Sequence, residues 1–108
     1  LVNGNTEVFP LSIHNNFTPD EYRMMDIYPN PFNSSTTIAI NPNNLLETPY
    51  SIYIYDALGR LVETLIDNRK ITGKKDIHWN ASNQASGIYF IQLRTNFNYE
   101  IKKVVLLK

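Results

Sequence analysis

Short segments in which apolar and polar side chains alternate recur through most of the chain. In residues 50–56, Ile52 and Ile54 project to one side of an extended backbone, and the tyrosines that follow each of them project to the other. Residues 88–95 alternate in the same way. This period of two predicts β-strands that bury one face, so we expect a core built from sheets rather than helices.

The segments between the predicted strands carry residues that form tight turns. Gly59, Gly73 and Gly87 stand at strand junctions, and Asn and Pro fill other connections. About seven short strands with regular turns are typical of an immunoglobulin-like fold. The sequence therefore predicts an all-β, immunoglobulin-like β-sandwich of about seven antiparallel strands. With no cysteine in the chain, packing alone must hold the core. The residues expected inside are Ile52, Ile54, Trp79, Tyr89, Ile91 and Leu93.

The N-terminal part shows no sustained period. The tetrapeptide TPDE at 18–21 matches the start of a helix, but few residues follow before the β pattern begins. We expect residues 1–25 to be a linker from an upstream domain and residues 26–108 to form the folded domain. The chain starts with Leu1 and has no signal-peptide pattern, so we expect any such signal upstream.

The charge distribution argues against nucleic acid as a partner. Ten basic and ten acidic residues give a net charge of zero, whereas nucleic-acid-binding domains carry a basic excess. We also expect no transmembrane segment, because no run approaches the roughly 20 apolar residues that span a bilayer. Residues 1–50 hold five acids and one base, and residues 51–108 hold nine bases and five acids. The second half can therefore present a basic face to a partner.

The sequence offers little for catalysis. His14 and His78 are the two histidines, and without cysteine they cannot supply the cluster of about four ligands that zinc prefers. Ser82 and Ser86 are candidate nucleophiles of a hydrolytic triad. His78 and Asp56 would complete it, but no nucleophile-elbow motif supports the arrangement. We expect no enzyme activity, no catalytic residue, no metal and no cofactor.

Aromatic residues of two predicted strands offer a platform for binding sugar. The simpler interpretation, which we favour, is that they pair across neighbouring strands of a sheet. These residues are Tyr50, Tyr53, Tyr55 and Phe90.

The last strand has apolar residues on both faces. Val104 and Leu106 share one face, and Val105 and Leu107 share the other. We expect one pair to lie in the core. The other pair, with the neighbouring lysines and any free strand edge, would remain to bind a partner by strand addition.

Two prolines, Pro29 and Pro31, stand directly before a predicted strand. Proline fixes φ and restricts the residue before it to extended shapes. We therefore expect the PNP tripeptide to be a stiff, extended lead-in that separates the linker from the folded domain. The same prolines would also guard an edge strand against aggregation.

Five segments, taken in order, resemble one family. They are YPNPFNSSTTI, IYIYDALGRLV, HWN, SGIYFIQL and KKVVLLK. Over about residues 25–108 the chain resembles the C-terminal sorting domain of the type IX secretion system of Bacteroidetes-related bacteria. The related immunoglobulin-like domain of the flagellar hook-capping protein shares the YDxxGR and SGxYxxxL patterns.

The resemblance implies delivery rather than chemistry. Such domains follow a covalently fused cargo and direct it from the periplasm across the outer membrane to the cell surface or the extracellular space. The implied partners are the type IX translocon and a sortase-like peptidase that removes the domain. The alternative function is a structural or carbohydrate-binding accessory domain of an extracellular enzyme. The residues expected to bind the translocon are Pro29, Asn30, Pro31, Gly87, Tyr89, Lys102, Lys103, Val104, Val105, Leu106, Leu107 and Lys108.

Overall fold

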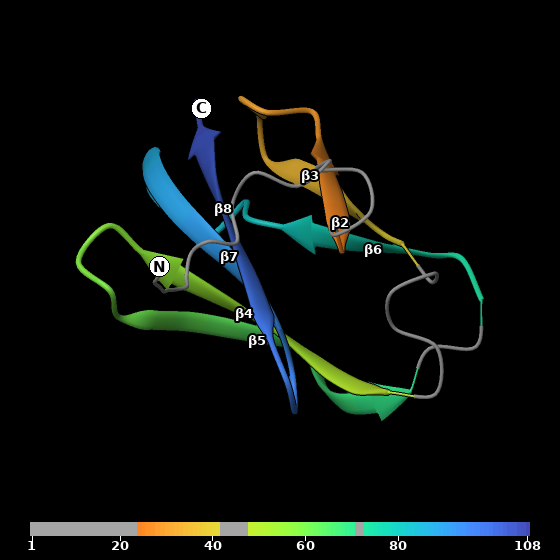
Figure 1. The fold of residues 1–108 in the computed structure, drawn as a ribbon. Coiled ribbons are helices and arrows are strands. Elements are labelled where there is room, and N and C mark those ends of the chain that lie inside the picture. The colour runs from red at the N-terminus through yellow and green to blue at the C-terminus, as the bar shows by residue number, and fades with distance from the viewer. Residues whose placement is uncertain (1–23, 42–47, 71–72) are drawn as a thin grey trace, which may run out of the picture.

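Two antiparallel sheets face each other in the computed structural model, which describes residues 24–41, 48–70 and 73–108 (Figure 1). One sheet has the strand order β2-β3-β6 and the other has the order β5-β4-β7-β8. The strands are β2 (Met25–Tyr28), β3 (Ser35–Ile40), β4 (Pro49–Asp56), β5 (Leu61–Lys70), β6 (Lys75–Asn80), β7 (Gly87–Thr95) and β8 (Tyr99–Leu106). These seven strands, with no helix among the described residues, confirm the predicted immunoglobulin-like β-sandwich.

Three pairs of consecutive strands form hairpins, and the connections β3–β4, β5–β6 and β6–β7 cross between the sheets. β2 pairs with β3, β4 with β5, and β7 with β8. β4 also pairs with β7 at the centre of the larger sheet, where Ile52 lies opposite Leu93 and Ile54 opposite Ile91. The predicted period of two therefore places these four side chains on the face that the smaller sheet covers.

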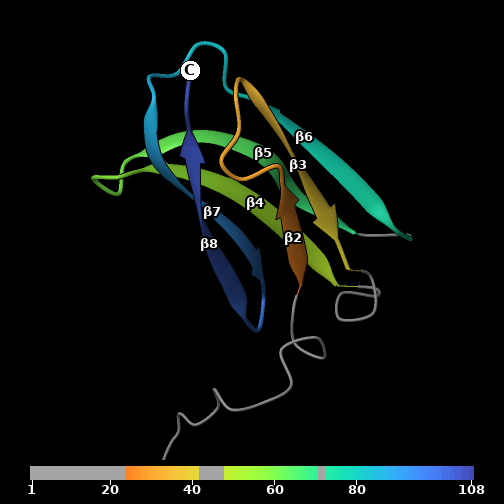
Figure 2. The same ribbon diagram turned by 90° about the horizontal axis from the view of Figure 1, so that it is seen from above.

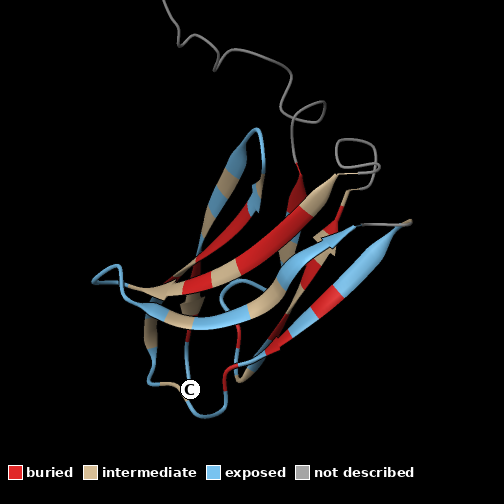
Figure 3. Ribbon diagram, turned by 90° about the horizontal axis from the view of Figure 1, so that it is seen from below, coloured by how far each residue is buried: buried red, intermediate tan, exposed pale blue. Residues whose placement is uncertain are grey.

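Trp79 lies at the centre of the core, with none of its surface exposed. Its ring centroid is 5.5 Å from that of Phe32 and 5.4 Å from that of Tyr89, and its indole Nε1 donates to Glu63 Oε1 at 3.1 Å. All six residues that the sequence predicted inside are buried. Buried positions alternate along β3 and β6, whereas the central strands β4 and β7 each contain a run of three buried residues and β5 has none (Figure 3).

Two residues that precede the predicted boundary at Asp26 pack against the sandwich, while the division of the chain into linker and domain stays a prediction. Met24 and Met25 are buried in the core, with 5% and 0% of their surface exposed, and Met25 pairs with Ile40 of β3. The four residues of β2 are too few for a period of two to stand out. The helical turn expected at 18–21 lies outside the described residues.

The PNP tripeptide is not an extended lead-in, and this prediction was wrong. Residues 29–31 form a bend between β2 and β3, which pair from Tyr28 opposite Thr37. After the bend the chain reaches β8 of the other sheet, where the Phe32 N–H donates to the Val105 carbonyl and the Leu107 N–H donates to the Phe32 carbonyl, both at 2.9 Å. The connection between β2 and β3 therefore also contacts the edge of the other sheet.

Candidate recognition surface at the C-terminal strand

The two faces of β8 divide as the alternation predicts. Val104 and Leu106 have no exposed surface, whereas Leu107 is 56% exposed and Lys103 lies at the surface. Val104 lies opposite Tyr89, and Leu106 opposite Gly87. The pair that enters the core is therefore Val104 and Leu106, and the other face of the strand is turned to solvent.

The side chain of Asn30 completes the outer edge of β8. Its Nδ2 donates to the Lys103 carbonyl at 3.0 Å, and its Oδ1 accepts from the Val105 N–H at 3.0 Å. An amide that donates and accepts in this way takes the place of a neighbouring strand's peptide group. Together with the bonds of Phe32, it covers the edge of β8 from the Lys103 carbonyl to Leu107. Strand addition by a partner is therefore blocked over this part of the edge.

The last residue, Lys108, forms hydrogen bonds with the connection between β6 and β7. The backbone N–H of Lys108 donates to Ser86 Oγ at 3.0 Å, and its ammonium donates to the Ser82 carbonyl at 2.6 Å. These contacts hold the end of the chain beside β7.

Tyr89 belongs to the core rather than to the surface. Its hydroxyl donates to the Ala85 carbonyl at 2.7 Å, and its ring lies edge-on to Trp79. A buried tyrosine whose hydroxyl bonds to the backbone a few residues upstream is the tyrosine corner of immunoglobulin-like folds. Because Tyr89, Val104 and Leu106 are buried, only the other members of the predicted recognition set are open to contact in the folded domain.

The YDALGR segment builds the turn between β4 and β5. Asp56 Oδ1 accepts from the backbone N–H groups of Leu58 and Arg60, and its Oδ2 accepts from Arg60 Nε, each at 2.9 Å. The backbone hydrogen bond from Arg60, above all, holds the pKa of the Asp56 carboxyl below its usual value. Gly59 has a φ of +83°, a conformation that favours glycine. The charged residues of this motif therefore stabilise a turn.

The residues considered for a hydrolytic triad are engaged separately. His78 Nδ1 lies 3.0 Å from Thr37 Oγ1, Asp56 is held in its own turn, and the Oγ of Ser86 accepts from Lys108. No hydrogen bond between described residues joins a serine, a histidine and an acid into a triad. Within 24–41, 48–70 and 73–108, no group of three His, Cys, Asp or Glu residues could hold a metal ion.

The aromatic platform is divided between the two faces of its sheet. Tyr50 is buried on the inner face, so it cannot join the others. Tyr53 and Tyr55 are half-buried on the outer face with ring centroids 6.4 Å apart. The Tyr53 ring lies 5.8 Å from the Arg94 guanidinium carbon, and the Tyr55 hydroxyl donates to Gln92 at 3.3 Å. These contacts favour cross-strand pairing.

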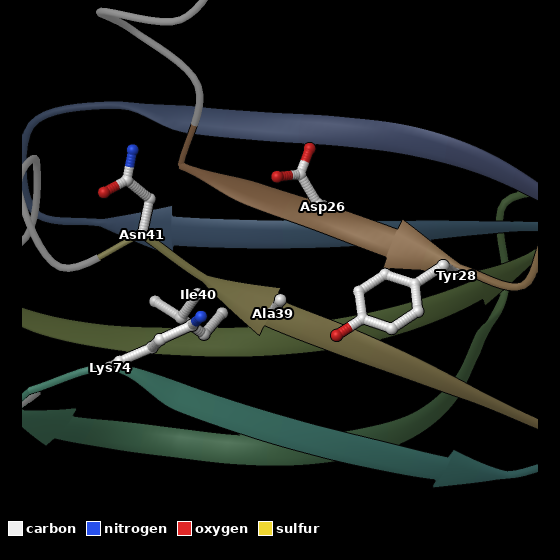
Figure 4. A pocket seen from close by; sticks show the side chains of 6 residues that line it. All are labelled: Asp26, Tyr28, Ala39, Ile40, Asn41 and Lys74. Carbon is white, nitrogen blue, oxygen red and sulfur yellow. The ribbon is translucent and has the colours of Figure 1, made fainter.

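A hollow of about 420 Å³ lies on the outer face of the smaller sheet (Figure 4). Ala39 forms part of its floor, and the ring of Tyr28 lies at one side. Its lining consists of Asp26, Tyr28, Ala39, Ile40, Asn41 and Lys74. The mixed charges and the exposed aromatic ring suit hydrogen bonding to a neutral polar molecule better than acid–base catalysis. The sequence interpretation did not single out these residues, since they come from three separate segments.

The sandwich, the tyrosine corner and the hydrogen-bonded C-terminal strand define an immunoglobulin-like domain. The family model for the secretion system C-terminal sorting domain matches residues 26–107, and the chain belongs to this family. The resemblance read from the five sequence segments is therefore confirmed. No curated protein matches the chain.

Among solved structures, the chain is similar to PorZ, an essential bacterial surface component of the type-IX secretion system of Porphyromonas gingivalis from the human oral microbiome. The TM-score is 0.57 and the sequence identity is 22%, over 78% of this chain and 11% of PorZ. The chain thus spans about a tenth of PorZ, and the likeness concerns the fold. No helix among the described residues is long and apolar enough to cross a membrane.

Proposed function

We propose that this domain is the C-terminal export signal of the type IX secretion system for a cargo fused ahead of it. The observation that carries the proposal is the family match over residues 26–107, which covers nearly the whole sandwich. Family membership makes the domain a sorting signal directed toward the cell surface or the extracellular space. The cargo, the passage through the periplasm and the removal of the domain by a sortase-like peptidase are the finer parts of the proposal.

Removal of the domain requires a cut that leaves the sandwich intact. Met24 and Met25 belong to the core, so we place the cut before Met24 rather than at Asp26. The preceding residues act as the linker to the cargo.

Recognition by the translocon is assigned to exposed groups around the end of the chain. Pro29 and Pro31 lie at the surface next to Lys103, and Leu107 and Lys108 follow at the end of the chain. The two lysines of the strand lie on opposite faces: Lys103 is exposed on the outer face, and Lys102 is half-buried with its ammonium 3.9 Å from Glu100. A basic and partly apolar surface of this kind suits an acidic partner surface.

The recognition model is tested with a secreted reporter fused ahead of residues 24–108. Reversing the charge of the strand with Lys102→Glu and Lys103→Glu should lower the secreted fraction of the reporter in a host with a type IX system. Lys74→Glu and Lys75→Glu form the matched control, because these exposed lysines lie at the start of β6. Equal secretion of both variants and the parent would contradict basic recognition.

Failure of the unaltered fusion to leave the cell would contradict the export function itself. The accessory-domain alternative would then gain support, with the hollow beside Tyr28 as the place for a ligand.

A further inference from the structure

The hydrogen bonds of β8 show which of its backbone N–H and C=O groups point away from β7. The Lys103 carbonyl, both backbone groups of Val105 and the Leu107 N–H all point to the segment containing Asn30 and Phe32. In a strand the N–H and C=O of alternate residues point to the same side. The odd-numbered residues of β8 therefore direct their backbone groups away from β7, whose pairing with β8 runs without a register shift.

The first half of this edge has no such cover. Tyr99 and Ile101 direct their N–H and C=O groups outward, as does the N–H of Lys103, and among the described residues no hydrogen bond reaches them. The side chains of Tyr99 and Ile101 are 62% and 50% exposed on the outer face. β8 lies at the border of its sheet, and Figure 2 shows this half of the strand leading away from the β7–β8 turn. An uncovered edge with apolar neighbours is a template for another strand.

The sequence of this half is complementary to itself in one antiparallel register. If a two-fold axis passes through Ile101, each residue lies opposite the residue of the second copy that is equally far from Ile101 on the other side. Glu100 then lies opposite Lys102 of the second copy. Tyr99 then lies opposite Lys103, and Ile101 meets its own equivalent. Opposite charges and an apolar contact are the cross-strand pairs that stabilise a sheet.

Two neighbouring registers would also place odd-numbered residues, whose backbone groups point outward, opposite each other. Both of these registers are unfavourable. A slip in one direction places Glu100 opposite Glu100, and a slip in the other places Lys102 opposite Lys102. Like charges directly opposite each other destabilise a pair of strands. The Asn30 side chain also ends the free edge at Lys103, so an added strand cannot slide toward the C-terminus.

Glu100 is held in position for this contact. Its Oε1 accepts from the backbone N–H groups of Met24 and Met25, both at 3.0 Å, while its Oε2 faces Lys102 at 3.9 Å. One carboxylate oxygen thus anchors the side chain to β2, and the other remains close to the strand edge.

We propose that residues 99–103 of β8 pair antiparallel with the same residues of a second copy. The two copies form an isologous dimer in which the larger sheets join into one. The contact is short, so we expect a weak dimer that forms at high local concentration. The proposal does not depend on the export function, and its test needs only the purified chain.

Sedimentation equilibrium of the chain and two variants tests the charge pairing. Lys102→Glu places like charges opposite each other twice in the dimer, so its dissociation constant should rise by about tenfold or more. Lys103→Glu changes the net charge equally but faces Tyr99 of the second copy, so its effect should be clearly smaller. A chain that stays monomeric up to about 1 mM, or equal effects of both variants, would overturn the proposal.

Cysteine cross-linking tests the register, because the chain has no cysteine of its own. The proposed pairing brings the Cα atoms at position 101 within about 5.5 Å of each other, inside the range that a disulfide spans. Ile101→Cys should therefore form a disulfide-linked dimer under mild oxidation. Tyr99→Cys is the matched control, since its two copies would lie about 13 Å apart along the strands. Equal or faster cross-linking of Tyr99→Cys would overturn the register.

Discussion

A single side-chain amide connects the start of the domain to its end. Asn30 follows β2, yet its two hydrogen bonds reach Lys103 and Val105 of the last strand. Because the amide supplies a donor and an acceptor at once, neither a carboxylate nor an aliphatic side chain can replace it. Asn30 was predicted to bind a partner, and the structure gives it an internal role as well.

Replacing Asn30 with Ala should lower the free energy of unfolding by about 0.5–1.5 kcal/mol, the usual net value of hydrogen bonds that stay accessible to water. Chemical denaturation measures the change. Asn33→Ala is the control in the same connection, because Asn33 is also exposed and has no comparable contact with β8. A loss of stability in Asn33→Ala as large as in Asn30→Ala would show that the contacts with β8 are not the cause.

Asp56 should make the stability of the β4–β5 turn depend on pH. Its pKa is lower in the folded domain than its ordinary value of 3.8, so the carboxylate stabilises the fold above that value. The stabilisation is lost as the pH falls through the lower, folded pKa. Melting temperatures of the parent and of Asp56→Asn, measured from neutral pH to about pH 2, should differ most at neutral pH and converge in acid. A difference that stays constant with pH would contradict this role.

At the scale of elements, β2 is the strand whose importance the sequence concealed. It has four residues, and the prolines directly after it suggested a boundary. In the structure, Met25 is buried and the bend after β2 carries Phe32 to Trp79. Longer strands such as β4 were predictable because apolar and polar side chains alternate along them, as at Ile52 and Ile54.

Met25→Ala should lower the free energy of unfolding by about 2–5 kcal/mol, the range for removing a buried methionine side chain. Tyr28→Ala in the same strand is the control, because the Tyr28 side chain lies at the surface and should contribute much less. Thermal denaturation of both variants measures the difference. If the Met25→Ala variant were as stable as the parent, β2 would have to be assigned to the linker and not to the folded domain.

Limited proteolysis tests the same boundary by a different route. The smallest stable fragment should begin at or before Met24, because a cut after Met25 removes two core side chains and the first residue of β2. Mass spectrometry of the resistant fragment gives its first residue. A stable fragment that starts at Ile27 or later would contradict the structural boundary.

At the scale of the whole molecule, the sequence predicted the architecture better than the candidate surface. The sandwich, its core and the division of the last strand into an inward and an outward pair follow from side-chain alternation, which is local, whereas the structure identifies Val104 and Leu106 as the inward pair. The contacts of Asn30 with Lys103 and of Lys108 with Ser82 join positions far apart in the chain. No periodic pattern reports such contacts, so the covered half of the β8 edge could not be foreseen.

The folded sandwich is compatible with a sorting signal that is recognised as a domain. The C-terminal strand is paired on one side with β7 and partly covered on the other by Asn30 and Phe32. The residues proposed for recognition at its end are therefore presented by the fold instead of forming a loose tail. Export should accordingly depend on the integrity of the sandwich as well as on the last residues.

Secretion of a reporter fused ahead of residues 24–108 tests the central claim most directly. The fraction of reporter outside the cell is measured in two bacterial strains that differ only in a functional type IX translocon. The account predicts that the reporter leaves the cell of the competent strain and stays inside the deficient one. Retention in both strains, or equal release from both, would contradict the assignment of this domain as a type IX export signal.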